Sequence, residues 1–183
     1  LYNDVTNIRE KAFKATFEIK GKALYGKLPV AFDMIREILM ESKLDDGKRI
    51  REILAMLKSR LLMKFQSSGH VTAVLRAQSY ASPAAKVKDM TNGIAFYETV
   101  SYLEEHFEEE KEKISEKLID LSKKLFRGDN MMLSYTAAKE GLQDMETMIS
   151  SMKASLNHEE PKDSPCMIHC QKKNEGFKTA SKV

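Results

Sequence analysis

The chain has 183 residues, a length that suits one domain or one domain with a tail. Hydrophobic residues make up 42% and charged residues 31%, so a core can form and general disorder is disfavoured. The net charge of +3 arises from 30 basic and 27 acidic residues, and this balance argues against nucleic acid as a partner.

Cysteine content and hydropathy narrow the setting further. Two cysteines are too few for a disulfide scaffold and suit a reducing compartment, which favours a cytoplasmic over a secreted location. Import into an organelle stays open if the chain is part of a longer eukaryotic protein. No apolar run approaches the roughly 18 residues of a membrane helix, so we expect no membrane partner. The first residues, 1–4, show no signal-peptide pattern.

The first two elements are expected to be a strand and a helix. Residues 12–24 alternate loosely between apolar and polar side chains, which predicts a strand. Residues 28–42 carry apolar side chains at helical spacing, and Pro29 suits the first turn of a helix. Residues 44–47 form the turn that follows.

Residues 46–80 contain no proline and predict one long helix, around which the chain is organised. In the first half, apolar residues share one face: Ile50, Ile53, Leu54, Leu57, Leu61 and Phe65. In the second half, Gly69, Ala73 and Ala77 lie four apart and stack on one side. Because a glycine inside a helix costs roughly 1 kcal/mol relative to alanine, we expect a neighbouring backbone to approach closely there.

Two more helices are predicted before residue 126. Ser82 as N-cap and Pro83 at the first helical position begin a helix that is expected to continue through Gly93 to about residue 107. The charged run 108–113 then supplies an acidic first turn, which the helix dipole favours, for a helix that extends to Leu125.

The last two elements are a strand at 131–137, predicted from alternation, and an amphipathic helix at 142–156. We interpret the methionines of this region as core rather than as an adaptable peptide-binding surface: Met131, Met132, Met145, Met148 and Met152. We assign residues 1–156 to one domain. Residues 157–183, rich in lysine and containing two prolines, are interpreted as a linker or tail.

The predicted order of strand, four helices, strand and helix indicates an α+β fold, in which amphipathic helices pack on a small antiparallel sheet. Two strands alone make a poor sheet, so further strands are expected from polypeptide outside this chain. Exposed strand edges of this kind invite pairing with a partner.

Several short motifs occur in a fixed order along most of the chain. They are Ser68-Gly69-His70, Ala73, Arg76-Ala77, Ser79-Tyr80, Ser82-Pro83, Gly93-Ile94, the run 125–131 and the run 174–179. This set resembles the domain that follows the linker hairpin in presequence-protease-type zinc metallopeptidases, inverzincins of the insulysin and pitrilysin clan. The resemblance implies a non-catalytic domain within a larger insulysin-type α/β roll.

Such an enzyme would degrade unfolded peptides inside a chamber between two halves, and this chain would form a wall opposite the metal. Its partners would be the remaining domains and, indirectly, the peptide. The resemblance places zinc in the parent enzyme and assigns no cofactor and no catalytic residue to this chain. The motif residues would have structural roles: Gly69, His70, Ala73, Arg76, Ala77, Tyr80 and Gly93. Residues 157–183 would lead into a last domain outside this chain.

The zinc signature of that clan is H-x-x-E-H, in which two histidines hold the metal and a glutamate activates water. The nearest string here is Tyr102-Leu103-Glu104-Glu105-His106, where tyrosine stands at the first ligand position. One histidine and a surface glutamate do not complete a zinc shell. We therefore interpret this string as a helix end and expect the chain alone to be inactive as a peptidase.

A second candidate metal cluster is formed by Cys166, His169 and Cys170, with His158 upstream. Structural zinc sites usually join two separated ligand pairs, and the sequence has no second cysteine pair. This cluster is a weak candidate. The alternative is a flexible linker that carries thiols.

His70 lies in the most family-like stretch. As a catalytic base it would need an orienting carboxylate and a nucleophile, but no acidic residue occurs from 64 to 87. We interpret it as a hydrogen-bonding residue at a helix junction. The alternative is that His70 and Arg76 face the substrate chamber.

Two rival functions remain at this stage. The chain could be a stand-alone helical interaction module without enzymatic activity. It could also be a small nucleic-acid-binding protein, but the near-balanced charge argues against this.

Overall fold

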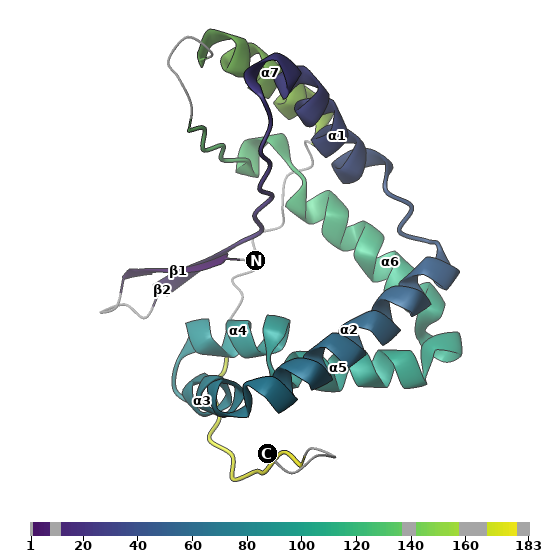
Figure 1. Ribbon diagram of the computed structural model, residues 1–183, viewed down its shortest axis with the longest axis vertical. Helices are drawn as coiled ribbons and strands as arrows, with labels where there is room; N and C mark the ends of the chain where they lie inside the picture. Colours follow the sequence, from purple (N-terminus) through teal and green to yellow (C-terminus); the bar gives the residue numbers. More distant parts are fainter. Residues whose placement is uncertain (1, 8–11, 137–141, 158–167, 179–183) are drawn as a thin grey trace. The chain divides into compact units, whose positions relative to one another are not determined.

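The computed structural model describes residues 2–7, 12–136, 142–157 and 168–178 (Figure 1). The contacts divide the chain into two units, which we describe separately. The first comprises Leu1–Glu18, Gly47–Lys111 and Pro165–Val183, and the second comprises Ile19–Asp46 and Glu112–Ser164. Within the described ranges, no helix is both long and apolar enough to cross a membrane.

The first unit contains a β-hairpin and a set of packed helices. Strands β1 (Tyr2–Asn7) and β2 (Ala12–Thr16) pair antiparallel, with an irregular register between Asp4 and Asn7. The helices are α2 (Gly47–Ser67), α3 (Gly69–Ser79), α4 (Pro83–Asn92), α5 (Ile94–Glu105) and the start of α6 (Phe107–Leu125). Helix α2 lies along α5, and α4 packs against both α3 and α5 (Figure 1).

The core of this unit lies between α2 and α5. Leu61, Phe65 and Ile94 form a buried cluster, and Phe96 and Tyr97 pack against it. The pattern that predicted a buried face on α2 is confirmed for Ile50, Leu54, Leu61 and Phe65. The polar opposite face of α2 joins α5 and α6 by ion pairs, in which Lys58 contacts Glu104 at 2.9 Å and Glu105 at 3.1 Å, and Arg51 contacts Glu108 at 3.1 Å.

The second unit is built from α1 (Leu28–Glu41), the remainder of α6, α7 (Leu142–Ser155) and two short 3-10 turns, η1 (Tyr25–Lys27) and η2 (Gly128–Asn130). Helix α7 contacts α1 and η2. The Tyr25 hydroxyl donates to Asp144 Oδ2 at 2.6 Å. Met145 and Met152 are buried as predicted, but Met132 is 83% exposed and is not a core residue.

The expected α+β class is wrong. The described residues are mostly helical, and their paired strands form a two-stranded hairpin rather than the sheet of an insulysin-type α/β roll. Residues 131–136 form no regular strand, and Ala137 lies outside the described ranges. The strand predicted at 12–24 forms only at Ala12–Thr16. Alternation of side chains is a weak signal, because a strand also needs a partner to satisfy its backbone hydrogen bonds.

Two helices predicted as continuous are each broken in two. The helix predicted at 46–80 breaks at Ser68, where two serines precede Gly69 and the Ser67 hydroxyl donates back to the Lys64 carbonyl. The helix predicted from Pro83 to about residue 107 breaks at Gly93, which ends α4 and begins α5. The start of α4 is confirmed, because Ser82 is its N-cap and accepts a hydrogen bond from the Ala85 amide.

The two glycines at these breaks differ in the space around them. A Cβ placed on Gly69 would meet no atom within 4 Å, so the close backbone approach expected there is wrong. A Cβ placed on Gly93 would overlap the Asp89 carboxylate and lie 2.9 Å from its Cα. Gly93 is therefore required because α5 begins directly against the last turn of α4.

This difference gives a matched pair of substitutions. Gly93→Ala should lower the free energy of unfolding by about 1–3 kcal/mol, because Asp89 must shift to admit the methyl group. Gly69→Ala should raise it by about 0.4–1 kcal/mol, because alanine restricts the unfolded chain and meets no obstacle. Urea unfolding of the two full-length variants measures both values. Equal effects of the two substitutions would contradict the packing described at Gly93.

Candidate functional site

The candidate site is organised by a buried ion pair between α3 and α4. Arg76, in the last turn of α3, donates from Nη1 to Asp89 Oδ2 at 2.6 Å. The Asp89 side chain is fully buried and that of Arg76 is 8% exposed. A buried charge is tolerated only when it is paired and hydrogen-bonded, and each partner supplies this for the other.

Asp89 also caps the next helix. Its Oδ1 accepts a hydrogen bond from the Ile94 amide at 3.0 Å and lies 3.5 Å from the Ala95 amide. A carboxylate at a helix N-terminus satisfies free amides and interacts favourably with the helix dipole. One carboxylate therefore joins α3, α4 and α5.

A second carboxylate reaches Arg76 from the C-terminal part of the unit. Glu175 Oε1 accepts from Arg76 Nε at 2.5 Å and from the Tyr80 hydroxyl at 2.5 Å. The hydrogen bond from Arg76, and then that from Tyr80, lowers the pKa of Glu175 to about 2. The same contact with Glu175 raises the pKa of Tyr80. Hydrogen bonding to Glu175 also raises the pKa of Arg76, so the guanidinium stays charged.

Two residues further on, Phe177 completes an aromatic cluster. Its ring centroid lies 5.5 Å from Phe65 and 5.6 Å from Tyr97, and both contacts are edge-to-face. Phe65 and Tyr97 meet each other in the same geometry at 5.5 Å. Such arrangements contribute about 0.5–1.5 kcal/mol per pair beyond area burial. The segment 173–177 is thus held against the helices by one charged and one aromatic contact.

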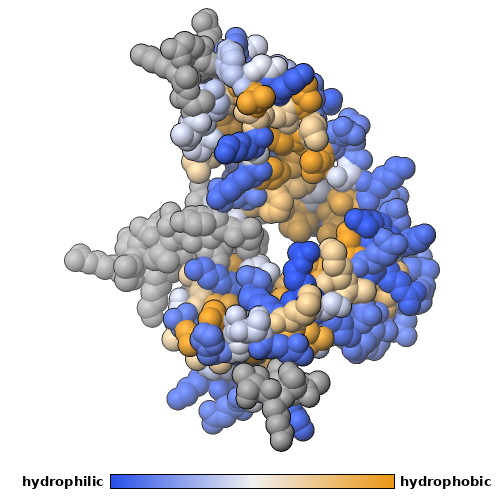
Figure 2. Space-filling model, in the orientation of Figure 1, coloured by the Kyte–Doolittle hydropathy of each residue, from blue (hydrophilic) through white to orange (hydrophobic). Residues whose placement is uncertain are grey.

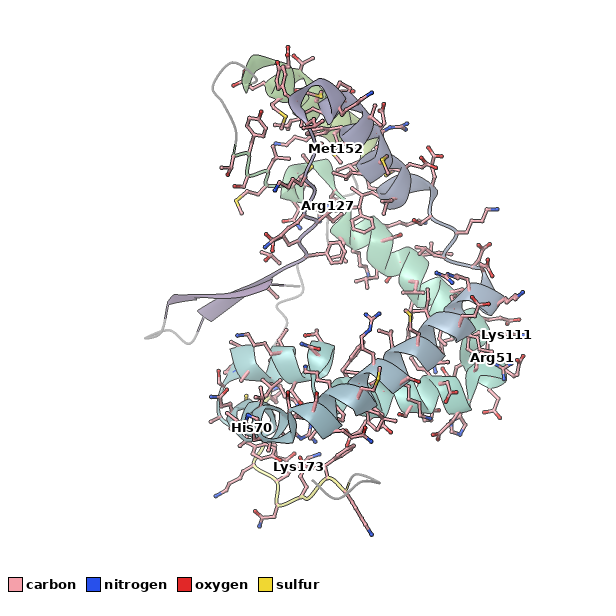
Figure 3. All side chains as sticks on the ribbon, in the orientation of Figure 1. Arg51, His70, Lys111, Arg127, Met152 and Lys173 are labelled. Carbon is pink, nitrogen blue, oxygen red and sulfur yellow. The ribbon has the colours of Figure 1, made fainter. Side chains whose placement is uncertain are left out.

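Between this segment and α3 lies a groove of about 750 Å³. Figure 3 shows His70 on α3 and Lys173 on the neighbouring C-terminal segment. Of the seven motif residues singled out from the sequence, six line the groove: Gly69, His70, Ala73, Arg76, Ala77 and Tyr80. The seventh, Gly93, lies against Asp89 at the start of α5. His70 is exposed, and it lines the groove together with Arg76.

Sequence reasoning missed three residues of the site. Asp89 was assigned no role, although an aspartate four positions before a glycine that separates two helices is a signal for capping. Glu175 and Phe177 lay in the stretch interpreted as a linker or tail. Only their partners on distant helices reveal their function, and no local pattern encodes those partners.

The candidate metal ligands do not form a zinc site within the described residues. His106 Nδ1 lies 3.0 Å from the Tyr102 carbonyl oxygen, and the two rings stack at 4.5 Å. Glu104 and Glu105 are engaged by Lys58. Cys166 and His158 lie outside the described ranges, whereas His169 and Cys170 belong to no group of three metal-binding side chains there. This donor set does not fit zinc.

The family of the chain follows from comparison with known proteins. The model of the family "Peptidase M-16C associated" matches residues 2–103, which is more than half of the chain. The chain belongs to this family. The resemblance to presequence-protease-type peptidases, inferred from the motifs of α3 and its surroundings, is thereby confirmed.

Individual relatives agree with this assignment. Protein HypA of Clostridium perfringens is 26% identical over 96% of this chain and 18% of its own length. Presequence protease 1, chloroplastic/mitochondrial, of Arabidopsis thaliana is 22% identical over 72% of this chain and 12% of its own length. The mitochondrial presequence protease of Drosophila melanogaster is 25% identical over 69% and 12%, respectively. The chain therefore spans less than a fifth of the length of these relatives.

The lowered pKa of Glu175 predicts a pH dependence of stability. Its folded pKa, about 2, lies below its ordinary value of 4.5, so the stability it contributes is fully present above about pH 4.5. This contribution is lost as the pH falls from about 4.5 towards 2. The stability difference between the wild type and Glu175→Gln, measured by urea unfolding at pH 7, 4.5 and 3, should therefore shrink only below pH 4.5.

Glu116→Gln is the matched control, because Glu116 is an exposed glutamate of α6. This variant should show no such pH-dependent difference from the wild type. A Glu175→Gln difference that is constant from pH 7 to pH 3 would contradict the ion pair with Arg76.

Proposed function

We propose that this chain is a non-catalytic domain of a zinc metalloendopeptidase that degrades unfolded peptides inside a chamber formed by two halves. The family match over residues 2–103 carries this proposal. Relatives named presequence protease support it, because the matching segment is 12% of each of the two enzymes compared. In this function the chain confines and positions peptide, while the metal chemistry belongs to another part of the longer protein.

An exposed apolar face supports a place within a larger assembly. Val30, Met34 and Ile38 lie four residues apart on α1, and their side chains are 53%, 58% and 58% exposed. Figure 2 shows hydrophobic residues at the surface in this part of the molecule. A stripe of large apolar side chains with this spacing is typical of a helix that packs on another element. In the proposed enzyme, the remaining domains cover it.

The zinc assignment follows from the donor sets. Within the described part of the chain, the string that most resembles the clan's zinc motif is occupied by stacking and by ion pairs to Lys58. The proposal therefore places both zinc ligands and the water-activating glutamate outside this chain. The Arg76–Asp89–Glu175 cluster has a mechanical role in this enzyme, because it fixes the helices against each other and holds the segment at 173–177.

Zinc content and peptidase activity provide the test. The purified chain should contain no stoichiometric zinc and should not hydrolyse unstructured peptides. The polypeptide encoded by the complete reading frame should contain about one zinc ion and should hydrolyse the same peptides. Zinc is measured by atomic emission, and cleavage is followed by mass spectrometry.

Two results would overturn the proposal. The first is stoichiometric zinc together with hydrolysis in this chain alone. The second is a complete reading frame that ends at these termini, which would instead favour a stand-alone helical interaction module.

A further inference from the structure

We propose that the groove on α3 is a binding site for peptide segments in which an aromatic residue follows a glutamate by two positions. The chain's own Glu175 and Phe177 are its resident occupants. The inference goes beyond the proposed function, because it concerns peptide recognition by this unit itself and requires neither zinc nor other domains.

The carboxylate end of the groove is built by the helices without the segment. Arg76 uses Nη1 to contact Asp89, which orients the guanidinium and leaves Nε directed at Glu175. The Tyr80 hydroxyl converges on the same oxygen of Glu175. Two donors held by α3 and its end thus define a receptor for one carboxylate, and a charged acceptor is favoured over a neutral one.

The aromatic end is formed by core residues. Phe65 is 2% exposed and is fixed within the core cluster by Leu61 and Ile94. Its ring and that of Tyr97 form a corner that receives Phe177 edge-to-face from two sides. This corner selects a flat ring, because quadrupole contacts of this kind require an aromatic partner.

The position between the two anchors is not read. A Cβ placed on Gly176 would meet no atom within 4 Å, so any side chain fits there. The recognised pattern is therefore glutamate, any residue, aromatic. The glycine of this chain is one instance of that middle position.

The resident segment leaves room for exchange. The Glu175 side chain is 33% exposed and Phe177 is 41% exposed, so water reaches both anchors. The groove also extends along exposed residues of α3, which include His70, Ala73 and Ala77. A separate peptide competes with a tethered segment whose effective concentration is in the millimolar range for a short linker. Weakening the resident anchors therefore opens the groove to a peptide in solution.

The test uses a fluorescein-labelled peptide with the sequence of residues 171–178 and fluorescence anisotropy. The full chain carrying Glu175→Ala and Phe177→Ala should bind this peptide at least about tenfold more tightly than the wild-type chain, since its own segment no longer competes. Circular dichroism verifies that the double variant keeps its helices. If it does not, Phe177→Ala alone replaces it, with the same expected direction.

Matched peptides test the recognised pattern. A peptide carrying Glu175→Gln and one carrying Phe177→Ala should each bind the double variant at least about fivefold more weakly, since each loses one anchor. A peptide carrying Gly176→Ala should bind within about twofold of the original, because the middle position faces open space. Failure of the double variant to bind, or equal binding of all four peptides, overturns the inference. Neither result bears on zinc content or hydrolysis, so the proposed function is tested separately.

Discussion

The buried ion pair between Arg76 and Asp89 is the interaction on which the first unit depends. Two charges removed from water are costly, and the cost is offset only if every remaining donor and acceptor is used. Asp89 does this by capping α5, and Arg76 does it by turning its remaining nitrogen towards Glu175. The short α4 and the abrupt start of α5 follow, because the carboxylate must reach both the guanidinium and the first amides of α5. Gly93 is the local condition for that geometry.

The same pair connects parts of the chain that are far apart in sequence. Residue 76 lies on α3, residue 89 on α4, and residue 175 near the C-terminal end of the described chain. A domain that serves as a wall in a larger enzyme must keep its shape while neighbouring domains move, and a buried charged joint gives this rigidity. Selection of a peptide by such a joint would use the same donors, which links the structural and recognition roles of the groove.

The sequence predicts helices better than it predicts where they break. Apolar spacing located the buried face of α2, and Ser82-Pro83 located the start of α4, because both are local signals. The breaks at Ser68 and Gly93 were missed, since tolerance of a glycine inside a helix depends on what packs beside it. The motif residues of α3 were found through resemblance, and most line one groove. Asp89, Glu175 and Phe177 were missed because their partners are on other elements.

A double-mutant cycle between Arg76 and Asp89 tests the central claim most directly. The free energy of unfolding is measured for the wild type, Arg76→Met, Asp89→Leu and the double variant. If the pair organises the unit, each single variant leaves a buried charge unpaired, and the double variant is more stable than the sum of the two losses predicts. The account predicts a coupling energy above about 1 kcal/mol. Losses that add to within about 0.5 kcal/mol, as for independent sites, would contradict it.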